Sequence, residues 1–368
     1  MRTRLLLAAV FAVVILAACD SGDDSATSSE TTQTTETSTA ASVATTAPAT
    51  TTTVASVAPV PSAGCGATPS VEPGEVKIDT TSGGAPRWYW RNVPSAYNGA
   101  VPVPLVLDFH GYSEGADVHL MMSEMRQRGA IEGFVTVTPQ GTGPVARWDT
   151  GFESPDMIFV GDLLDEVEET LCIDRRMVYA TGLSNGAGMT SAVACVYADR
   201  VAAFAPVAGI RALDDCAPAR PAPVIAFHGT EDGFLPYEGG VGEAVSNLPA
   251  ADGSGRTISD DLPDVVQERP SVPDTTAAWA ARNGCDPTPT TSDAEFAEDV
   301  VVIGYDCPDG ADVQLLRIEG GGHSWPGSAF SQQLESLLGF TNMTLDTNGV
   351  MFNFFVHHRL PAELLETP

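Results

Sequence analysis

From about residue 103 the chain alternates short apolar runs with longer segments whose apolar residues recur at helical spacing. The apolar runs are continuous, which is typical of strands that helices cover on both faces of a parallel sheet. They lie at 103–109, 133–139, 176–182, 201–209, 222–229 and 313–319. Helices are expected between them, at about 117–128, 157–171 and 185–198. This alternation predicts an α/β fold with a mostly parallel sheet and right-handed crossovers.

The first residues follow a different pattern. Arg2 and Arg4 precede an apolar run over 5–16, which is too short to span a bilayer comfortably and predicts a signal peptide at 1–18. Small residues directly before Cys19 resemble a bacterial lipobox, in which cleavage exposes a cysteine that is then acylated. We therefore expect a lipoprotein anchored to the membrane at Cys19, on the extracytoplasmic side. An ordinary secretory signal, which would release the protein, is the alternative.

Residues 19–64 are rich in Thr, Ser and Ala, and the stretch over 20–62 contains no aromatic residue. Such a segment cannot bury enough apolar surface to offset its ordering entropy, so we expect a disordered tether. The catalytic or binding domain is then predicted at 65–368.

Composition excludes one class of partner. The chain has 48 acidic and 18 basic residues and a net charge of -30. Nucleic-acid binding requires a cationic surface that displaces phosphate counterions, so no nucleic acid is expected. A strongly acidic surface fits a soluble, self-repelling domain, and we expect a monomer.

Six cysteines remain when Cys19 is set aside, and an even set in an exported chain indicates up to three disulfides. Cys285 and Cys307 flank one polar excursion and are the best candidate pair, whereas the sequence does not select the other pairings. The chain contains no Cys-x-x-Cys motif, so no zinc site is expected.

One serine stands between two glycines, in the segment TGLSNGAG at 181–188. Ser184 follows a predicted strand and precedes a predicted helix, where the nucleophile elbow of an α/β-hydrolase lies. Gly182 and Gly186 suit a tight turn in which a side chain would collide with neighbouring backbone. The helix N-terminus also favours the negative charge that develops during acyl transfer. A purely structural Gly-Ser turn is the alternative interpretation.

A serine nucleophile needs a histidine base, and in this fold the chain order is serine, acid, histidine. His323 lies in a glycine-rich loop after the last predicted strand and is our candidate. His228 ends a strand and is expected to pack beneath the following loop. His357 and His358 close the terminal helix and are expected to be surface or cap residues.

The acid is expected in the loop that follows the strand 222–229. Asp232 is the better candidate because a short carboxylate just beyond a strand end can hold the second imidazole nitrogen, and Glu231 is the fallback. For the oxyanion hole we expect the backbone N–H groups of Asn185 and Tyr112. Trp148, Tyr237 and Trp325 are candidates for the substrate pocket. No cofactor or metal is required by this chemistry.

Six blocks of the sequence carry a family resemblance. They are DFHGYSEGA, TPQG, TGLSNGAGM, AFHGTEDGFLPY, SVPDTTAAWAARNGC and GGGHSWPG, in this order from about residue 70 to the terminus. Together they resemble the polyhydroxybutyrate depolymerase-like esterases, a group that includes feruloyl and acetylxylan esterases of carbohydrate esterase family 1. The resemblance implies an α/β-hydrolase fold, a mostly parallel central sheet with helices on both faces, and the triad Ser184, Asp232 and His323.

The expected activity is hydrolysis of carboxylic esters, either short hydroxyalkanoate oligomers or feruloyl and acetyl esters. A peptidase or acyltransferase on the same fold and a non-catalytic surface binding module are the alternatives. The polar, glycine-rich stretch 238–270 separates the acid from the base and is either a lid or an exposed insertion.

Overall fold

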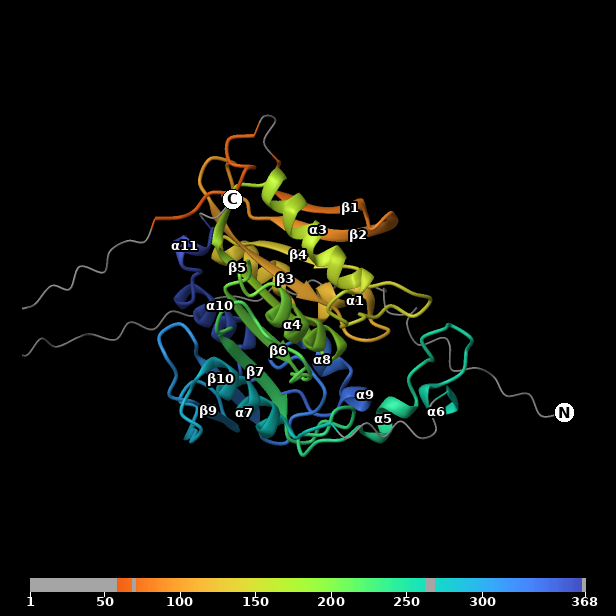
Figure 1. Ribbon diagram of the computed structural model, residues 1–368. Coiled ribbons are helices and arrows are strands. Elements are labelled where there is room, and N and C mark those ends of the chain that lie inside the picture. The colour runs from red at the N-terminus through yellow and green to blue at the C-terminus, as the bar shows by residue number, and fades with distance from the viewer. Residues whose placement is uncertain (1–57, 68–70, 262–268, 366–368) are drawn as a thin grey trace, which may run out of the picture. The chain divides into compact units, whose positions relative to one another are not determined.

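The computed structural model describes residues 58–67, 71–261 and 269–365, and within these ranges a single ten-stranded sheet forms the centre of the fold (Figure 1). The strand order is β1-β2-β4-β3-β5-β6-β7-β10-β9-β8. The strands are β1 (Gly74–Ser82), β2 (Ala85–Val93), β3 (Val103–Phe109), β4 (Val135–Pro139), β5 (Ile173–Leu183), β6 (Ala203–Val207), β7 (Val224–Gly229), β8 (Thr290–Asp293), β9 (Val300–Gly304) and β10 (Val313–Ile318).

The six central strands β4, β3, β5, β6, β7 and β10 are parallel. Antiparallel strands flank them, with β2 on β4, β1 on β2, β9 on β10 and β8 on β9. This arrangement is the α/β-hydrolase fold, as expected from the sequence. It brings the carboxyl ends of all six central strands to one edge of the sheet.

Helices cover both faces of the sheet. They are α1 (Gly115–Met122), α2 (Met125–Glu132), α3 (Pro155–Thr170), α4 (Asn185–Val196), α5 (Glu243–Ser246), α6 (Ile258–Asp261), α7 (Val272–Asn283), α8 (Ala329–Gln333), α9 (Glu335–Leu338), α10 (Thr347–His357) and α11 (Ala362–Leu365). Side chains of α3, α4 and α7 belong to one hydrophobic core, and side chains of α2 and α10 belong to the other. Alternate residues of β3 point into the two cores: Leu105 and Leu107 into the first, Val106 into the second.

Most predicted elements are confirmed, with one informative difference. The single helix expected at 117–128 is two helices, because the chain breaks at Ser123 and Glu124. Glu124 has a φ of 52°, which no α-helix accommodates, and the Ser123 hydroxyl donates to Asp108 Oδ2 at 2.6 Å. The antiparallel strands β1, β2, β8 and β9 were not expected from the sequence.

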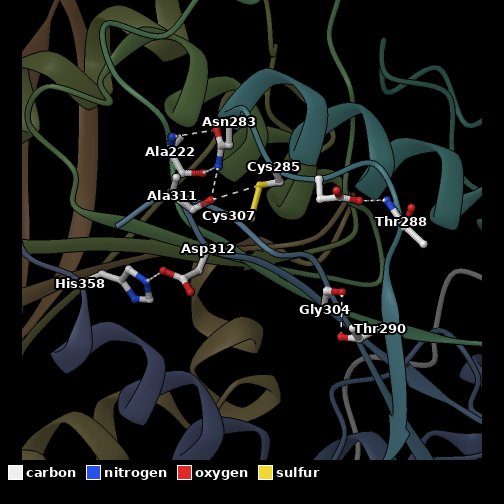
Figure 2. Close-up of a disulfide and its surroundings, with 11 residues drawn as sticks. Ala222, Asn283, Cys285, Thr288, Thr290, Gly304, Cys307, Ala311, Asp312 and His358 are labelled. Carbon is white, nitrogen blue, oxygen red and sulfur yellow. Dashed lines mark hydrogen bonds and ion pairs between the residues drawn. A yellow bond between two sulfur atoms is a disulfide. The ribbon is translucent and has the colours of Figure 1, made fainter. Parts of the chain in front are cut away.

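Three disulfides cross-link the fold, and the predicted Cys285–Cys307 pair is one of them (Figure 2). The others join Cys65 to Cys172 and Cys195 to Cys216. Beside the Cys285–Cys307 bond, the Asn283 side chain donates to the backbone oxygens of Ala222 and Ala311. The disulfide therefore reinforces the junction between α7 and the sheet.

The folded unit begins earlier than the predicted residue 65. Ser62 N–H donates to the Ile173 carbonyl at 2.9 Å, Gly64 N–H donates to the Glu168 carbonyl at 2.9 Å, and Pro61 bridges Asp174. Residues 58–64 are thus part of the folded unit and not of the tether. The predicted signal peptide, Cys19 and the tether up to residue 57 lie outside the described residues. Within the described part of the chain, no helix is long and apolar enough to cross a membrane.

Candidate active site

Ser184 occupies a strained turn between β5 and α4. Its φ of 57° and ψ of −112° lie outside the regions that L-residues normally adopt. The turn fits because Gly186 has no side chain: a Cβ there would lie 2.0 Å from the Phe109 carbonyl oxygen. Strain of this kind at a serine that follows a sheet strand is typical of a nucleophile elbow.

The candidate acid and base are joined directly. Asp232 follows β7 and His323 follows β10, and His323 Nδ1 donates to Asp232 Oδ2 at 2.7 Å. Both side chains are buried. Ser184 follows β5, so all three residues lie at the carboxyl edge of the parallel strands. The second acid candidate, Glu231, is exposed and is not the partner of His323.

Asp232 is held as a carboxylate. Burial by itself would raise its pKa, but the adjacent His323 and the hydrogen bonds from His228 and His323 lower it below the usual value for an aspartate. The backbone N–H groups of Phe234 and Leu235 both donate to Asp232 Oδ1 at 2.8 Å. A permanently ionised acid can orient the imidazole and stabilise the imidazolium that forms when the base accepts a proton.

Ser184 is partly exposed, whereas the ring of His323 stacks on Phe234 with 4.7 Å between ring centroids. In this structure no hydrogen bond joins Ser184 Oγ to His323 among the described residues. Catalytic hydrogen bonds are commonly long in unliganded enzymes and tighten when substrate binds. Ser184 can therefore be reached from solvent, while Phe234 and Asp232 fix the ring of its predicted base, His323.

The two predicted oxyanion residues, Asn185 and Tyr112, both have side chains that bond to backbone groups of other loops. Asn185 is the first residue of α4, and the first N–H groups of a helix have no partner within it. The Asn185 side chain accepts from Trp148 N–H at 2.6 Å and donates to the Trp148 carbonyl at 3.2 Å. Tyr112 lies in the loop after β3, and its hydroxyl donates to the Pro249 carbonyl at 2.8 Å.

The three aromatic residues predicted for the substrate pocket, Trp148, Tyr237 and Trp325, are all buried. Trp148 Nε1 donates to the His110 carbonyl, and Trp325 Nε1 donates to Asn348 Oδ1. A buried indole N–H needs such a partner, which fixes the ring inside the fold. Trp325 does border a surface pocket of about 360 Å³, but none of the triad residues lines it.

The stretch 238–270 is partly described. It contains α5 and α6, and the Tyr112–Pro249 hydrogen bond brings it beside the predicted oxyanion loop. Residues 262–268 lie outside the described residues, so the choice between a lid and an exposed insertion stays open. Over 58–67, 71–261 and 269–365, no group of three or more His, Cys, Asp or Glu residues is arranged to hold a metal ion.

Comparison with known proteins gives the family relation. The chain is 27% identical over 245 residues to "Feruloyl esterase B" of Piromyces equi, covering 63% of this chain and 41% of that protein. It is 31% identical over 191 residues to "Feruloyl esterase D" of Neurospora crassa, covering 49% of this chain and 65% of that protein. The chain is thus similar in sequence to proteins named feruloyl esterases. No family model matches it.

The chain spans less than two thirds of the length of either protein. Among solved structures, an acetyl xylan esterase from Aspergillus awamori superposes with a TM-score of 0.46 and 14% identity over 72% of this chain and all of that one. The relation to polyhydroxybutyrate depolymerases stays a prediction.

Proposed function

We propose that the protein is an extracytoplasmic serine esterase that uses Ser184, His323 and Asp232. The observation that carries this proposal is the buried Asp232–His323 hydrogen bond at the same sheet edge as the strained Ser184 turn. The relation to feruloyl esterases supports the same reaction class. Three disulfides favour an oxidising compartment, in agreement with the predicted export signal.

The reaction proceeds through an acyl-enzyme. His323 Nε2 takes the Ser184 hydroxyl proton as Oγ forms a bond to the ester carbonyl carbon, and the carbonyl electron pair moves to its oxygen. The backbone N–H groups of Asn185 and Tyr112 bind that oxyanion. When the tetrahedral intermediate collapses, the alcohol leaves with the proton from His323. Water, activated by the same imidazole, then releases the acid.

The substrate class is a small or oligomeric ester with a feruloyl, acetyl or short hydroxyalkanoate acyl group. The feruloyl assignment has the most support, because relatives named feruloyl esterases match this chain at 27% and 31% identity. Acylation of Cys19 would retain the enzyme at a membrane surface. If residues 1–18 act instead as an ordinary secretory signal, the enzyme is released. No nucleic acid takes part, and the enzyme acts as a monomer.

The test compares the full-length protein with Ser184→Ala. We expect the wild type to hydrolyse methyl ferulate, p-nitrophenyl acetate or a soluble hydroxybutyrate trimer. In the variant, kcat should be lower by at least about 10⁴-fold. A fluorophosphonate probe should label the wild type and not the variant. Wild-type protein that hydrolyses no ester and takes no label would overturn the proposal. Hydrolysis of the matching ferulamide at a similar rate would instead indicate a peptidase.

A further inference from the structure

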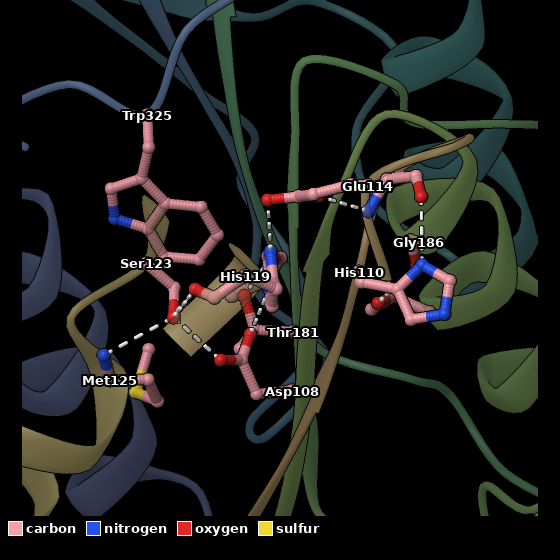
Figure 3. A network of polar contacts seen from close by, with 12 residues as sticks. Asp108, His110, Glu114, His119, Ser123, Met125, Thr181, Gly186 and Trp325 are labelled. Carbon is pink, nitrogen blue, oxygen red and sulfur yellow. Dashed lines mark hydrogen bonds and ion pairs between the residues drawn. The ribbon is translucent and has the colours of Figure 1, made fainter. Parts of the chain in front are cut away.

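A fully buried histidine connects β3 to the loop that holds Tyr112 (Figure 3). His119 Nε2 lies 2.8 Å from Asp108 Oδ1, and its Nδ1 lies 3.1 Å from Glu114 Oε1. The other oxygen of Asp108 accepts from the Ser123 hydroxyl at 2.6 Å. The triad does not include this cluster.

The geometry sets the charge of His119. Ionised carboxylate oxygens can only accept hydrogen bonds, so both ring nitrogens of His119 must donate, and the ring is an imidazolium. Burial would lower the pKa of His119, but the Asp108 and Glu114 carboxylates raise it to about 10. His119 in turn lowers the pKa of Glu114, which burial alone would raise. Among the described residues, His110 also acts on the pKa of Glu114, and Asp156 acts in turn on the pKa of His110.

Glu114 connects the His119 cluster to the loop that contains Gly111 and Tyr112. Its second oxygen, Oε2, accepts from the Gly111 N–H at 2.5 Å, while Oε1 faces His119 (Figure 3). One carboxylate thus joins a buried cation to a backbone group one residue before Tyr112.

A second buried histidine, His110, contacts the peptide between Gly111 and Tyr112. Unlike His119, it is neutral. His110 Nε2 accepts from the Gly141 N–H at 2.9 Å, so the proton of the neutral ring is on Nδ1, which donates to the Gly111 carbonyl at 2.7 Å. Burial lowers the pKa of His110 to about 4, which keeps the ring neutral at physiological pH. The Gly111 carbonyl and the Tyr112 N–H belong to one planar peptide and point in opposite directions. Fixing the carbonyl therefore fixes the N–H.

We propose that His119, Glu114 and His110 are positioning residues that aim the Tyr112 N–H at the substrate carbonyl oxygen. The first two hold the Gly111 N–H, and the third holds the Gly111 carbonyl. This inference rests on the proposed esterase function. It explains why a loop that must bind an oxyanion is supported by buried charges instead of apolar packing: an oxyanion donor contributes to catalysis only if its direction is fixed before the reaction.

The test compares Glu114→Ala with Glu114→Gln in the full-length protein. The alanine variant removes the acceptor of the Gly111 N–H, and we expect kcat for the best ester substrate to fall about 100-fold with KM changed less than about threefold. Glutamine keeps one acceptor oxygen for the Gly111 N–H but turns an N–H2 group toward His119, so it should restore only part of kcat. His358→Gln is the matched control, because it also alters a buried histidine that contacts a carboxylate, Asp312 at 2.8 Å, far along the chain from the loop. Its kcat should stay within about twofold of wild type.

A second measurement does not depend on activity. Nitrogen-15 NMR of the wild-type imidazoles should show His119 with both nitrogens protonated at pH 8 and His110 as the neutral Nδ1–H tautomer. A His119 ring that is neutral at pH 8 overturns the inference, even if Glu114→Ala does not fold. An active wild type with an unchanged kcat in Glu114→Ala overturns it as well and leaves the esterase proposal standing. A wild type with no esterase activity and no fluorophosphonate labelling overturns both.

Discussion

At the scale of single residues, the Asp232 carboxylate contacts two imidazole rings and not only one. His323 Nδ1 contacts Asp232 Oδ2 at 2.7 Å, and His228 Nε2 lies 3.3 Å from the same oxygen. His228 Nε2 also donates to the Leu235 carbonyl at 2.8 Å, and the ring is buried beneath that loop, as expected from the sequence. His228 thus fixes both the acid and the loop that carries it.

Replacement of His228 should therefore affect turnover through Asp232. We expect His228→Ala to lower kcat about tenfold with little change in KM, because the acid loses one donor and its loop loses one hydrogen bond. His228→Gln offers an amide donor and should recover part of kcat. Steady-state kinetics on matched folded fractions provides the measurement. Equal kcat values for all three proteins would show that His228 does not help to position Asp232.

The residues that follow strands in short motifs could be predicted from sequence, because chain order and strand ends already place Ser184, Asp232 and His323 at one sheet edge. The roles of His119 and Glu114 could not be predicted. Their partners lie within 11 residues, but whether a helical histidine points at Asp108 depends on how α1 packs. The same holds for the contacts of Trp148 and Trp325, because a motif gives the position of a ring along the chain and not its direction.

At the scale of elements, a continuous run of apolar residues identifies strands that helices bury on both faces, but it does not identify exposed strands. β3 was predicted to the residue, since all but its first two residues are buried. In β1 and β8 nearly every side chain is at least partly exposed, so their sequences carry no apolar run. Their pairing comes from neighbouring strands, which local sequence does not encode.

The junction of β3 with the β5–α4 turn gives an element-scale test. A Cβ at Gly186 would meet the backbone oxygens of Phe109 and His110 at 2.0 and 2.6 Å, and backbone atoms cannot rotate away. We expect Gly186→Ala to lower the free energy of unfolding by at least about 3 kcal/mol. The control is Gly304→Ala in β9, where the nearest atom would be Thr290 Oγ1 at 3.7 Å. Similar stability of the two variants in urea unfolding would contradict this account of the turn.

At the scale of the whole molecule, the disulfides differ in the length of chain that they close. Cys65–Cys172 spans 107 residues, and Cys195–Cys216 spans 21. In the chain-entropy model, loss of the first should cost about 4–5 kcal/mol and loss of the second about 3 kcal/mol. Denaturant unfolding of Cys65→Ser/Cys172→Ser and Cys195→Ser/Cys216→Ser provides the comparison. Equal costs would indicate that residues 58–67 detach without affecting the rest of the fold.

The two buried histidines His110 and His119 also make the stability of the whole fold depend on pH in opposite directions. The pKa of His110 is lowered from 6.5 to about 4, so its contribution is present above pH 6.5 and is lost as pH falls toward 4. The depressed pKa of Asp232 adds a separate loss only as pH falls below 3.8, the ordinary value for an aspartate, since its carboxylate stabilises the fold only while it is ionised. The pKa of His119 is raised from 6.5 to about 10, so its contribution is present below pH 6.5 and is lost as pH rises through 10.

Stability should therefore be greatest near pH 6.5 and fall on both sides, as measured by urea unfolding across pH 4–10. A net charge of -30 offers a competing explanation for the alkaline fall, because surface repulsion grows as remaining cations are neutralised. Salt separates the two causes. Repulsion between exposed charges is largely screened at about 0.5 M salt, whereas the buried contacts of His119 are not. We expect the fall between pH 7 and 10 to persist in high salt and to flatten in His119→Gln. A fall that high salt abolishes would assign it to the surface instead.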